Sequence, residues 1–327
     1  MSGRGLNASQ MGGQAFADWM DAQNPVFGRP NWNRFQAVMD NLGNQYAQDL
    51  FVYSVDLGAI NSGASAIGQI NIDRKSAFEA VMLTGGGATE AGGVFSPLNG
   101  IDLTLVSGDG SRSLMQRAVP TANMLGTGDF PAVLPINRRF MPATQLSVFA
   151  HVYDTANMAD VQVALIGRKI WMDAIPGAAN QALPRFNTWQ DGQSGLIYSE
   201  DLFYYDFALD SLANNTTTPV IVLFEAESDF EWILTTGSSL TTEGPAVDAT
   251  STPVSVQVID TGDGRRLFNN PIPMGMIAGS GQQPFVVPQP RIFTAKSSIE
   301  VDFTNTSGST VTHIHFTMIG RKIFEQD

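Results

Sequence analysis

Metal chemistry in this chain would depend on three histidines: His151, His313 and His315. His313 and His315 are two residues apart, so on a β-strand they share one face and could bind zinc with a third ligand. The residues that fill the opposite face of that strand are apolar: Ile314, Phe316 and Met318. We therefore predict that His313 and His315 face solvent or a subunit, and we leave metal binding by this pair open.

Two Gly-Asp-Gly triplets, at 108–110 and 262–264, could begin calcium-binding loops. A calcium site needs about six to eight oxygen ligands. Neither triplet is followed by the spaced Asp, Asn and Glu residues that would supply them. Because glycine adopts positive φ angles without strain, we interpret both triplets as turns between strands.

A Gly-Arg-Lys motif occurs at 167–169 and again at 320–322. It could contact phosphate, but it lacks the further glycines and the helix start of a P-loop. We predict that the glycine permits a β-bulge or a close approach of two backbones. We also predict that Arg168 and Lys169 complement acidic groups of a neighbouring segment.

Other catalytic constellations are missing from the sequence. Glu225 and Glu227 share a strand face, but nothing accompanies them that would make a glycosidase pair. No serine lies in a nucleophile elbow, and the chain contains no cysteine. The sequence therefore predicts no enzyme, no cofactor, and no catalytic, cofactor-binding or metal-binding residue.

An internal repeat fixes the elements that position these residues. Segments return in the same order about 152 to 154 residues later, which indicates a tandem duplication of one module of roughly 120 residues. The matched segments are 51–53 with 203–205, 78–85 with 230–237, 108–110 with 262–264, and 166–171 with 319–324. The histidine pair is not repeated, because Asp160 and Gln162 stand at the matching positions.

Both modules are predicted to be β-sandwiches. Apolar and polar residues alternate in many short segments that are separated by turn formers, as in sheets with one buried face. The strands predicted in the first module are 50–57, 66–73, 77–83, 101–107, 112–118, 132–136, 145–152 and 161–171. Those in the second module are 202–209, 219–226, 230–236, 253–260, 265–270, 298–303 and 311–323. Eight strands per module would make each one a jelly roll.

The predicted division of the chain is an N-terminal helical arm at 1–50, jelly roll 1 at 51–171, a linker at 172–202 and jelly roll 2 at 203–327. In the arm, apolar residues at helical spacing predict a helix from Trp32 to about Tyr46, and a shorter one from Gln14 to Ala22. The fold class is therefore all-β, two tandem jelly rolls with a short helical N-terminal segment.

Composition limits the function classes. Only 15% of the 327 residues are charged, against about 25% in typical proteins, and the net charge is −13. A surface so poor in charge fits either cover by other protein or a merely polar surface. Nucleic-acid binding needs clustered Lys and Arg, which the sequence lacks. No stretch approaches 18 consecutive apolar residues, so no membrane span is predicted.

A longer pattern in the second module resembles a module of bacteriophage virion proteins. It runs from Val258 through Gly-Asp-Gly and Arg265 to Pro271, then through 284–288 to the Gly-Arg-Lys ending at 320–322. With the duplication, the chain resembles the double jelly-roll major capsid proteins of tailless, internal-membrane bacteriophages. In that family three chains form a pseudo-hexagonal capsomer of six jelly rolls, and N-terminal segments lie on the inner side of the shell.

The resemblance implies a capsid protein located in the virion shell and assembled in the host cytoplasm. Its implied partners are two further copies in a homotrimer, neighbouring capsomers, and vertex or minor capsid proteins. The N-terminal arm would contact the inner membrane surface or simply pack beneath the first module. Two alternatives stay open: an accessory protein of a tailed phage (cement, decoration or head fibre), and a carbohydrate-binding sandwich that uses Trp171, Trp189 or Trp232.

Overall fold

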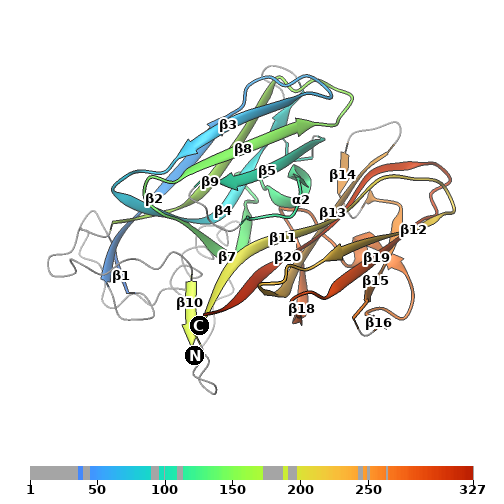
Figure 1. Cartoon of the computed structure of the whole chain (residues 1–327). Helices are drawn as coiled ribbons and strands as arrows, with labels where there is room; N and C mark the ends of the chain where they lie inside the picture. Colours follow the sequence, from blue (N-terminus) through green and yellow to red (C-terminus); the bar gives the residue numbers. More distant parts are fainter. Residues whose placement is uncertain are drawn as a thin grey trace, which may run out of the picture.

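A computed structural model describes residues 36–39, 45–89, 96–98, 100–108, 113–171, 187–190, 197–241, 246–248, 251–262 and 264–326. The protein is nearly all β, with 65% of residues in strands and 3% in helices, arranged as four antiparallel sheets (Figure 1). Within the described part of the chain, no helix is long and apolar enough to cross a membrane.

Residues of the first module form two sheets that face each other (Figure 1). The first sheet has the order β1 (Gln36–Met39), β2 (Gln45–Asp56), β9 (Asp160–Trp171), β4 (Ser76–Ala88) and β7 (Ala132–Phe140). The second has the order β3 (Ser65–Asn71), β8 (Gln145–Val152), β5 (Ile101–Ser107) and β6 (Val119–Pro120). A single helical turn, α2 (Thr121–Met124), follows β6.

The second module repeats this order. One sheet contains β10 (Asn187–Gln190), β11 (Ile197–Leu212), β20 (Val311–Gln326), β13 (Asp229–Thr241) and β14 (Ala246–Asp248), with β18 (Phe285–Phe293) also paired to β13. The other contains β12 (Thr217–Leu223), β19 (Ser298–Asn305), β15 (Val254–Asp260) and β16 (Arg265–Arg266), with β17 (Ile272–Pro273) paired to β15. The 3-10 turn η2 (Met274–Met276) follows β17.

The strand order identifies the fold. In the first module β2 and β9 pair in one sheet while β3 and β8 pair in the other, so the first and last strands of the module are neighbours. β11 pairs with β20 and β12 with β19 in the same way in the second module. This order is that of a jelly roll, and the chain is therefore a tandem double jelly roll, as predicted.

Alternating apolar residues form the two cores. The pairs that alternation singled out are fully buried: Leu103 and Leu105, Leu146 and Val148, Val256 and Val258, Ile299 and Val301. The strands bury one face because each sheet has its partner on that side only. The aromatic core of the second jelly roll includes Phe224, which stacks on Phe230 and Phe293.

The glycine of each Gly-Arg-Lys motif lies opposite a β-bulge, as predicted. β4 shifts its register between Ala80 and Met82, where it faces Gly167, and β13 shifts between Trp232 and Leu234. A Cβ atom at Gly167 would lie 2.0 Å from the carbonyl oxygen of Glu79. Only glycine fits, because real Cβ atoms do not approach an oxygen so closely.

Several element predictions are wrong. The helix expected from Trp32 to Tyr46 is contradicted at its described residues, since β1 pairs antiparallel with the start of β2 there. Apolar residues at helical spacing also suit two short strands. The helix expected at 14–22 lies outside the described residues. The division of the chain at residues 51, 172 and 203 stays a prediction.

Strand lengths near the sandwich ends also differ. The strand expected at 112–118 is replaced by the two-residue β6, and that at 265–270 shortens to β16. The predicted strand at 132–136 extends to Phe140 as β7. Its counterpart β18 was not predicted, because Pro288 and Pro290 argue against a strand; it forms because it lies at an edge, where missing N–H donors are tolerated.

Candidate functional site: the interface between the jelly rolls

The two jelly rolls contact each other through a built interface, here called the inter-roll interface. It joins β6, β7, α2 and residues 114–116 of the first roll to β11, β13, β14 and β20 of the second (Figure 1). The core of the first roll extends across it and includes four side chains of the second: Leu202, Tyr204, Leu234 and Ile319. The interface is thus an extension of a hydrophobic core.

Backbone hydrogen bonds fix the register of the interface. The N–H of Tyr204 donates to the carbonyl of Leu114 at 3.0 Å, and the N–H of Gln116 donates to the carbonyl of Tyr204 at 3.3 Å. Residues 114–116 therefore run alongside β11 as a short parallel addition, with Met115 bridged to Tyr204. The segment predicted as a strand at 112–118 pairs here rather than within its own module.

The turn α2 inserts a polar side chain into the interface. Asn123 is fully buried, and its Nδ2 donates to Thr317 Oγ1 at 3.0 Å. Thr236 Oγ1 donates to the backbone carbonyl of Asn123 at 3.0 Å. The N–H of Gly281 donates to the carbonyl of Ala122 at 2.7 Å. These bonds satisfy polar groups that would be costly to bury alone.

A buried ion pair joins β7 of the first roll to β11 of the second. Arg138 on β7 contacts Asp201 on β11, and both side chains are almost completely buried. Arg138 also lies over the ring of Phe140. Because removal of either partner would leave a buried charge without its counter-ion, this contact fixes the two rolls relative to each other.

The histidine pair lies in the same interface. His315 is buried, and its Nδ1 lies 2.8 Å from Asp206 Oδ2 on β11, while Thr317 Oγ1 donates to Asp206 Oδ1 at 2.7 Å. The ring of His313, which has a φ of 46°, stacks on Tyr153 of the first roll at 4.7 Å. The prediction that the pair faces solvent or a subunit is therefore wrong for His315, which the first roll of the same chain covers.

Electrostatics favour a charged His315. Burial opposes protonation, but the carboxylates of Asp206 and Asp102 outweigh it and raise the pKa of His315 above its ordinary value. Burial raises the pKa of Asp102, whose Oδ1 has no hydrogen-bond partner. Burial and the neighbouring His315 lower the pKa of His313. The cluster is thus a proton-binding group that spans both rolls.

Metal binding finds no support at these histidines. Among the described residues, no group of three or more His, Cys, Asp and Glu side chains is arranged to hold a metal ion. Asp206 engages His315 as a hydrogen-bond partner at the Nδ1 nitrogen. The geometry is that of a buried polar contact between two protein surfaces.

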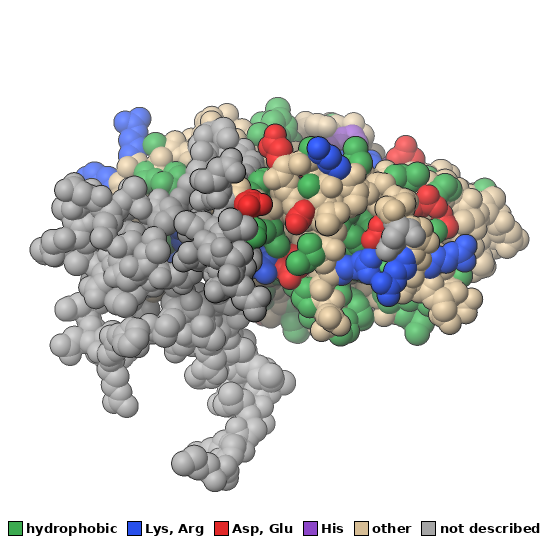
Figure 2. Space-filling view, turned by 60° about the horizontal axis from the view of Figure 1, so that its bottom comes forward, with side chains coloured by type: hydrophobic (Ala, Val, Ile, Leu, Met, Phe, Trp, Pro, Cys, Tyr) green, Lys and Arg blue, Asp and Glu red, His purple; other side chains and the backbone are tan. Residues whose placement is uncertain are grey.

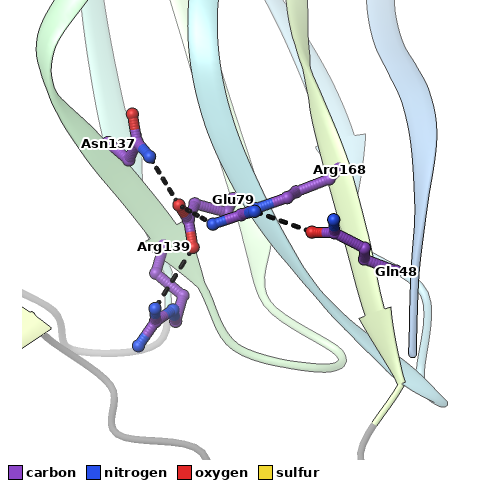
Figure 3. Close-up of polar contacts among 5 residues, drawn as sticks. All are labelled: Gln48, Glu79, Asn137, Arg139 and Arg168. Atoms are coloured by element: carbon purple, nitrogen blue, oxygen red, sulfur yellow. Dashed lines mark hydrogen bonds and ion pairs between the residues drawn. The ribbon is translucent and has the colours of Figure 1, made fainter. Parts of the chain in front are cut away.

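The Gly-Arg-Lys motifs form ion pairs outside the inter-roll interface. Glu79 on β4 accepts from Arg168 at 2.9 Å and from Arg139 at 3.1 Å, with Asn137 and Gln48 completing the network (Figure 3). Burial opposes ionisation of Glu79, but the two arginines outweigh it and lower its pKa. Lys169 lies 3.7 Å from the ring centroid of Phe51 and pairs with Asp73. The predicted role of Arg168 and Lys169 is confirmed.

The remaining sequence candidates that the structure describes lie in a turn, in the core or in an ion pair. Gly264 has a φ of 68°, as predicted for a turn residue, while Asp109, Gly110 and Asp263 lie outside the described residues. Trp232 is buried, and its Nε1 donates to the carbonyl of Leu234 at 3.0 Å, so it offers no sugar platform. Glu225 pairs with Lys322 rather than with Glu227.

Sequence reasoning missed Asp206, Asp102, Asn123 and the Arg138–Asp201 pair. A signal existed for one of them: Asp206 stands alone between Tyr205 and Phe207 in an apolar strand. A charged residue in such a position needs a partner. The partners themselves come from segments far away along the chain, which local patterns do not reveal.

The fold defines the class of protein as a double jelly roll, and solved structures with a similar arrangement include viral capsid proteins. No family model and no curated protein matches the sequence. The STIV MCP is 10% identical, with 83% of this chain and 96% of that chain covered and a TM-score of 0.38. PBCV-1 VP54, fitted into a reconstruction of the virophage Sputnik, is 10% identical, with 90% and 97% covered and a TM-score of 0.37.

An enzyme shares the same general resemblance. A peptide-N(4)-(N-acetyl-β-D-glucosaminyl) asparagine amidase is 8% identical, with 84% of this chain and 100% of that chain covered and a TM-score of 0.29. At such scores the likeness carries no functional argument. The function is therefore argued from the chain's own surfaces.

Proposed function

We propose that this chain is a structural virion protein, the major capsid protein of an icosahedral bacteriophage shell. Three copies would form a trimeric, pseudo-hexagonal capsomer, since two jelly rolls per chain give six per trimer. The observation that carries this proposal is the inter-roll interface, which joins two duplicated rolls through a shared core and a buried ion pair. Such a joint makes a rigid building block rather than two domains on a flexible linker.

The face in Figure 2 supports a role in assembly. Hydrophobic side chains lie in several places on it, between polar, acidic and basic groups. Exposed large hydrophobics occur in both rolls, among them Leu50, Ile67, Val286 and Ile292. Where such side chains are neighbours on one strand face, as Leu50 and Val52 are on β2, the surface is typical of one that another protein covers. The geometry of the described polar clusters favours contacts between protein surfaces, which accords with a protein that is not an enzyme.

The finer roles follow from the resemblance described above. The partners would be neighbouring capsomers and vertex or minor capsid proteins, with no direct nucleic-acid contact. The chain would be located in the capsid shell after assembly in the host cytoplasm, and the N-terminal arm would contact an inner membrane surface.

Light scattering after size exclusion tests the proposal. We expect a mass near three times 35.2 kDa for the purified full chain, and regular particles in electron micrographs of the source. A mass of 35.2 kDa at every concentration would contradict it. The copy number per virion separates a major capsid protein, which dominates the protein mass, from an accessory virion protein.

A further inference from the structure

Two matching rows of side chains have very different exposure. On the outer face of β11, Leu202 is 0% and Tyr204 is 2% exposed, because the first roll covers them. The duplication places Leu50 and Val52 at the same positions of β2, where they are 64% and 48% exposed. The first roll therefore presents the same kind of apolar row that the inter-roll interface buries in the second.

The surface of the first roll that covers Leu202 and Tyr204 also has a counterpart in the second roll. In the first roll this side consists of residues 114–117, α2 and β7. The second roll carries the matching residues 267–270, η2 and β18, after the same strand order. Met276 matches Asn123, since each is the third residue after the proline that ends β17 or β6. Asn123 is fully buried in the interface, whereas Met276 is 67% exposed.

The charged residues of the inter-roll interface also have counterparts in the repeat. Arg138 and Asp201 form the buried pair of the inter-roll interface. Their counterparts by the repeat are Arg291 on β18 and Asp49 on β2, and Asp49 is exposed. Arg291 Nη2 donates to Asp260 at 2.7 Å, and the Arg291 side chain is 29% exposed. The exposed part of the guanidinium can therefore donate to a second carboxylate.

We propose that the second jelly roll of one chain docks head to tail on the first jelly roll of another copy, repeating the inter-roll interface between chains. In this contact Met276 and β18 cover Leu50 and Val52, and Arg291 pairs with Asp49 of the neighbouring chain. The contact is heterologous, because the two surfaces come from different parts of the chain. It rests on the proposed trimer, whose ring it closes through three identical contacts.

Charge reversal in the full chain tests the contact, with mass measured by light scattering. We expect Asp49→Arg or Arg291→Asp alone to yield mostly 35.2 kDa chains, and the double variant to recover the trimer. Recovery in the double variant excludes misfolding as the cause. Met276→Asp should also dissociate the trimer. Ile67→Asp on β3 is the matched control, since Ile67 is 64% exposed like Leu50 but lies outside the contact; it should remain trimeric.

The outcomes separate this contact from the capsid role. A wild-type trimer that survives both single reversals would overturn the contact and leave the capsid proposal standing. Dissociation of the single variants with recovery in the double variant supports the contact, even if the source yields no particles and the capsid role fails. A wild-type chain that stays monomeric at all concentrations overturns both.

Discussion

The two jelly rolls share one strand order but differ at the positions that meet a neighbour. Asp206, His315 and Thr317 lie on the outer face of the second roll, and Ser54, Gln162 and Ala164 match them in the first. The contact within the chain therefore contains a proton-binding cluster, whereas the proposed contact between chains relies on apolar side chains and one ion pair. The Arg–Asp pair is common to both copies, whereas the histidine cluster belongs to the contact within the chain.

The largest expected effect distinguishes the two matched aspartates. Asp201→Asn leaves Arg138 buried without its counter-ion, so the free energy of unfolding should fall by about 3–5 kcal/mol at every protein concentration. Asp49→Asn should act only through association, so its effect on stability should vanish on dilution. Urea unfolding over a range of protein concentrations measures both. An equal fall in the free energy of unfolding for the two variants in dilute solution would show that Asp49, like Asp201, is already paired within one chain.

The matched leucines should give the next largest difference. Leu202→Ala removes a fully buried side chain from the core that crosses the interface, which costs about 2–5 kcal/mol. Leu50→Ala removes an exposed side chain, so a dilute, dissociated chain should change by no more than about 0.5 kcal/mol. Thermal unfolding at low protein concentration compares them. A large loss for Leu50→Ala under those conditions would mean that its side chain is already covered within one chain.

The smallest expected effect is a pH dependence of the histidine cluster at the inter-roll interface, which has no counterpart on the outer face of the first roll. The pKa of His315 is raised, so its contribution to stability is complete below about 6.5 and is lost as pH rises through the folded value. Asp102 acts in the same direction, since burial raises its pKa and favours the protonated carboxyl. His313 acts in the opposite direction, because its pKa is lowered and acid therefore destabilises its buried form.

His315→Gln, which installs the residue found at Gln162 in the first roll, should reduce the loss of stability with rising pH to the part that Asp102 contributes, and should leave the acid loss. The groups that face His315 are Asp206 on β11, Asp102 on β5 and Arg117 before β6, with His313 on its own strand. Urea midpoints measured on either side of neutral pH report the change. Gln162→His in the first roll is the control, and it should leave the alkaline profile unaltered. An unchanged alkaline slope in His315→Gln would assign the titration to another group.

The fold could be predicted from the sequence because the alternation of apolar and polar residues within each strand indicates which face is buried. Alternation at Leu103 and Leu105 or at Val256 and Val258 needs no knowledge of the partner sheet. β18 was not predicted because it contains two prolines, which argue against a strand. They are tolerated because β18 lies at the edge of its sheet, where their missing N–H groups break no hydrogen bond of the ladder. The helix expected after Trp32 was wrong because one spacing of apolar residues suits both a helix and a pair of short strands.

The interface could be predicted only in part. The unrepeated histidines indicated that the two modules face different surroundings, but the partners Asp206 and Asp102 lie on strands that are far apart along the chain. Pairing such as that of Arg138 with Asp201 depends on how two finished sandwiches meet. The periodicity of a sequence predicts the strands of each sandwich, but it does not predict how the two sandwiches are oriented relative to each other.

Gly167 and Gly320 have an evolutionary consequence. Any side chain at either position would collide with a backbone carbonyl, at 2.0 Å from Glu79 in the first roll and 1.8 Å from Glu231 in the second. The same steric requirement therefore acts in both copies of the duplicated module. It explains why glycine is retained at this position while the residues around it differ between the two rolls.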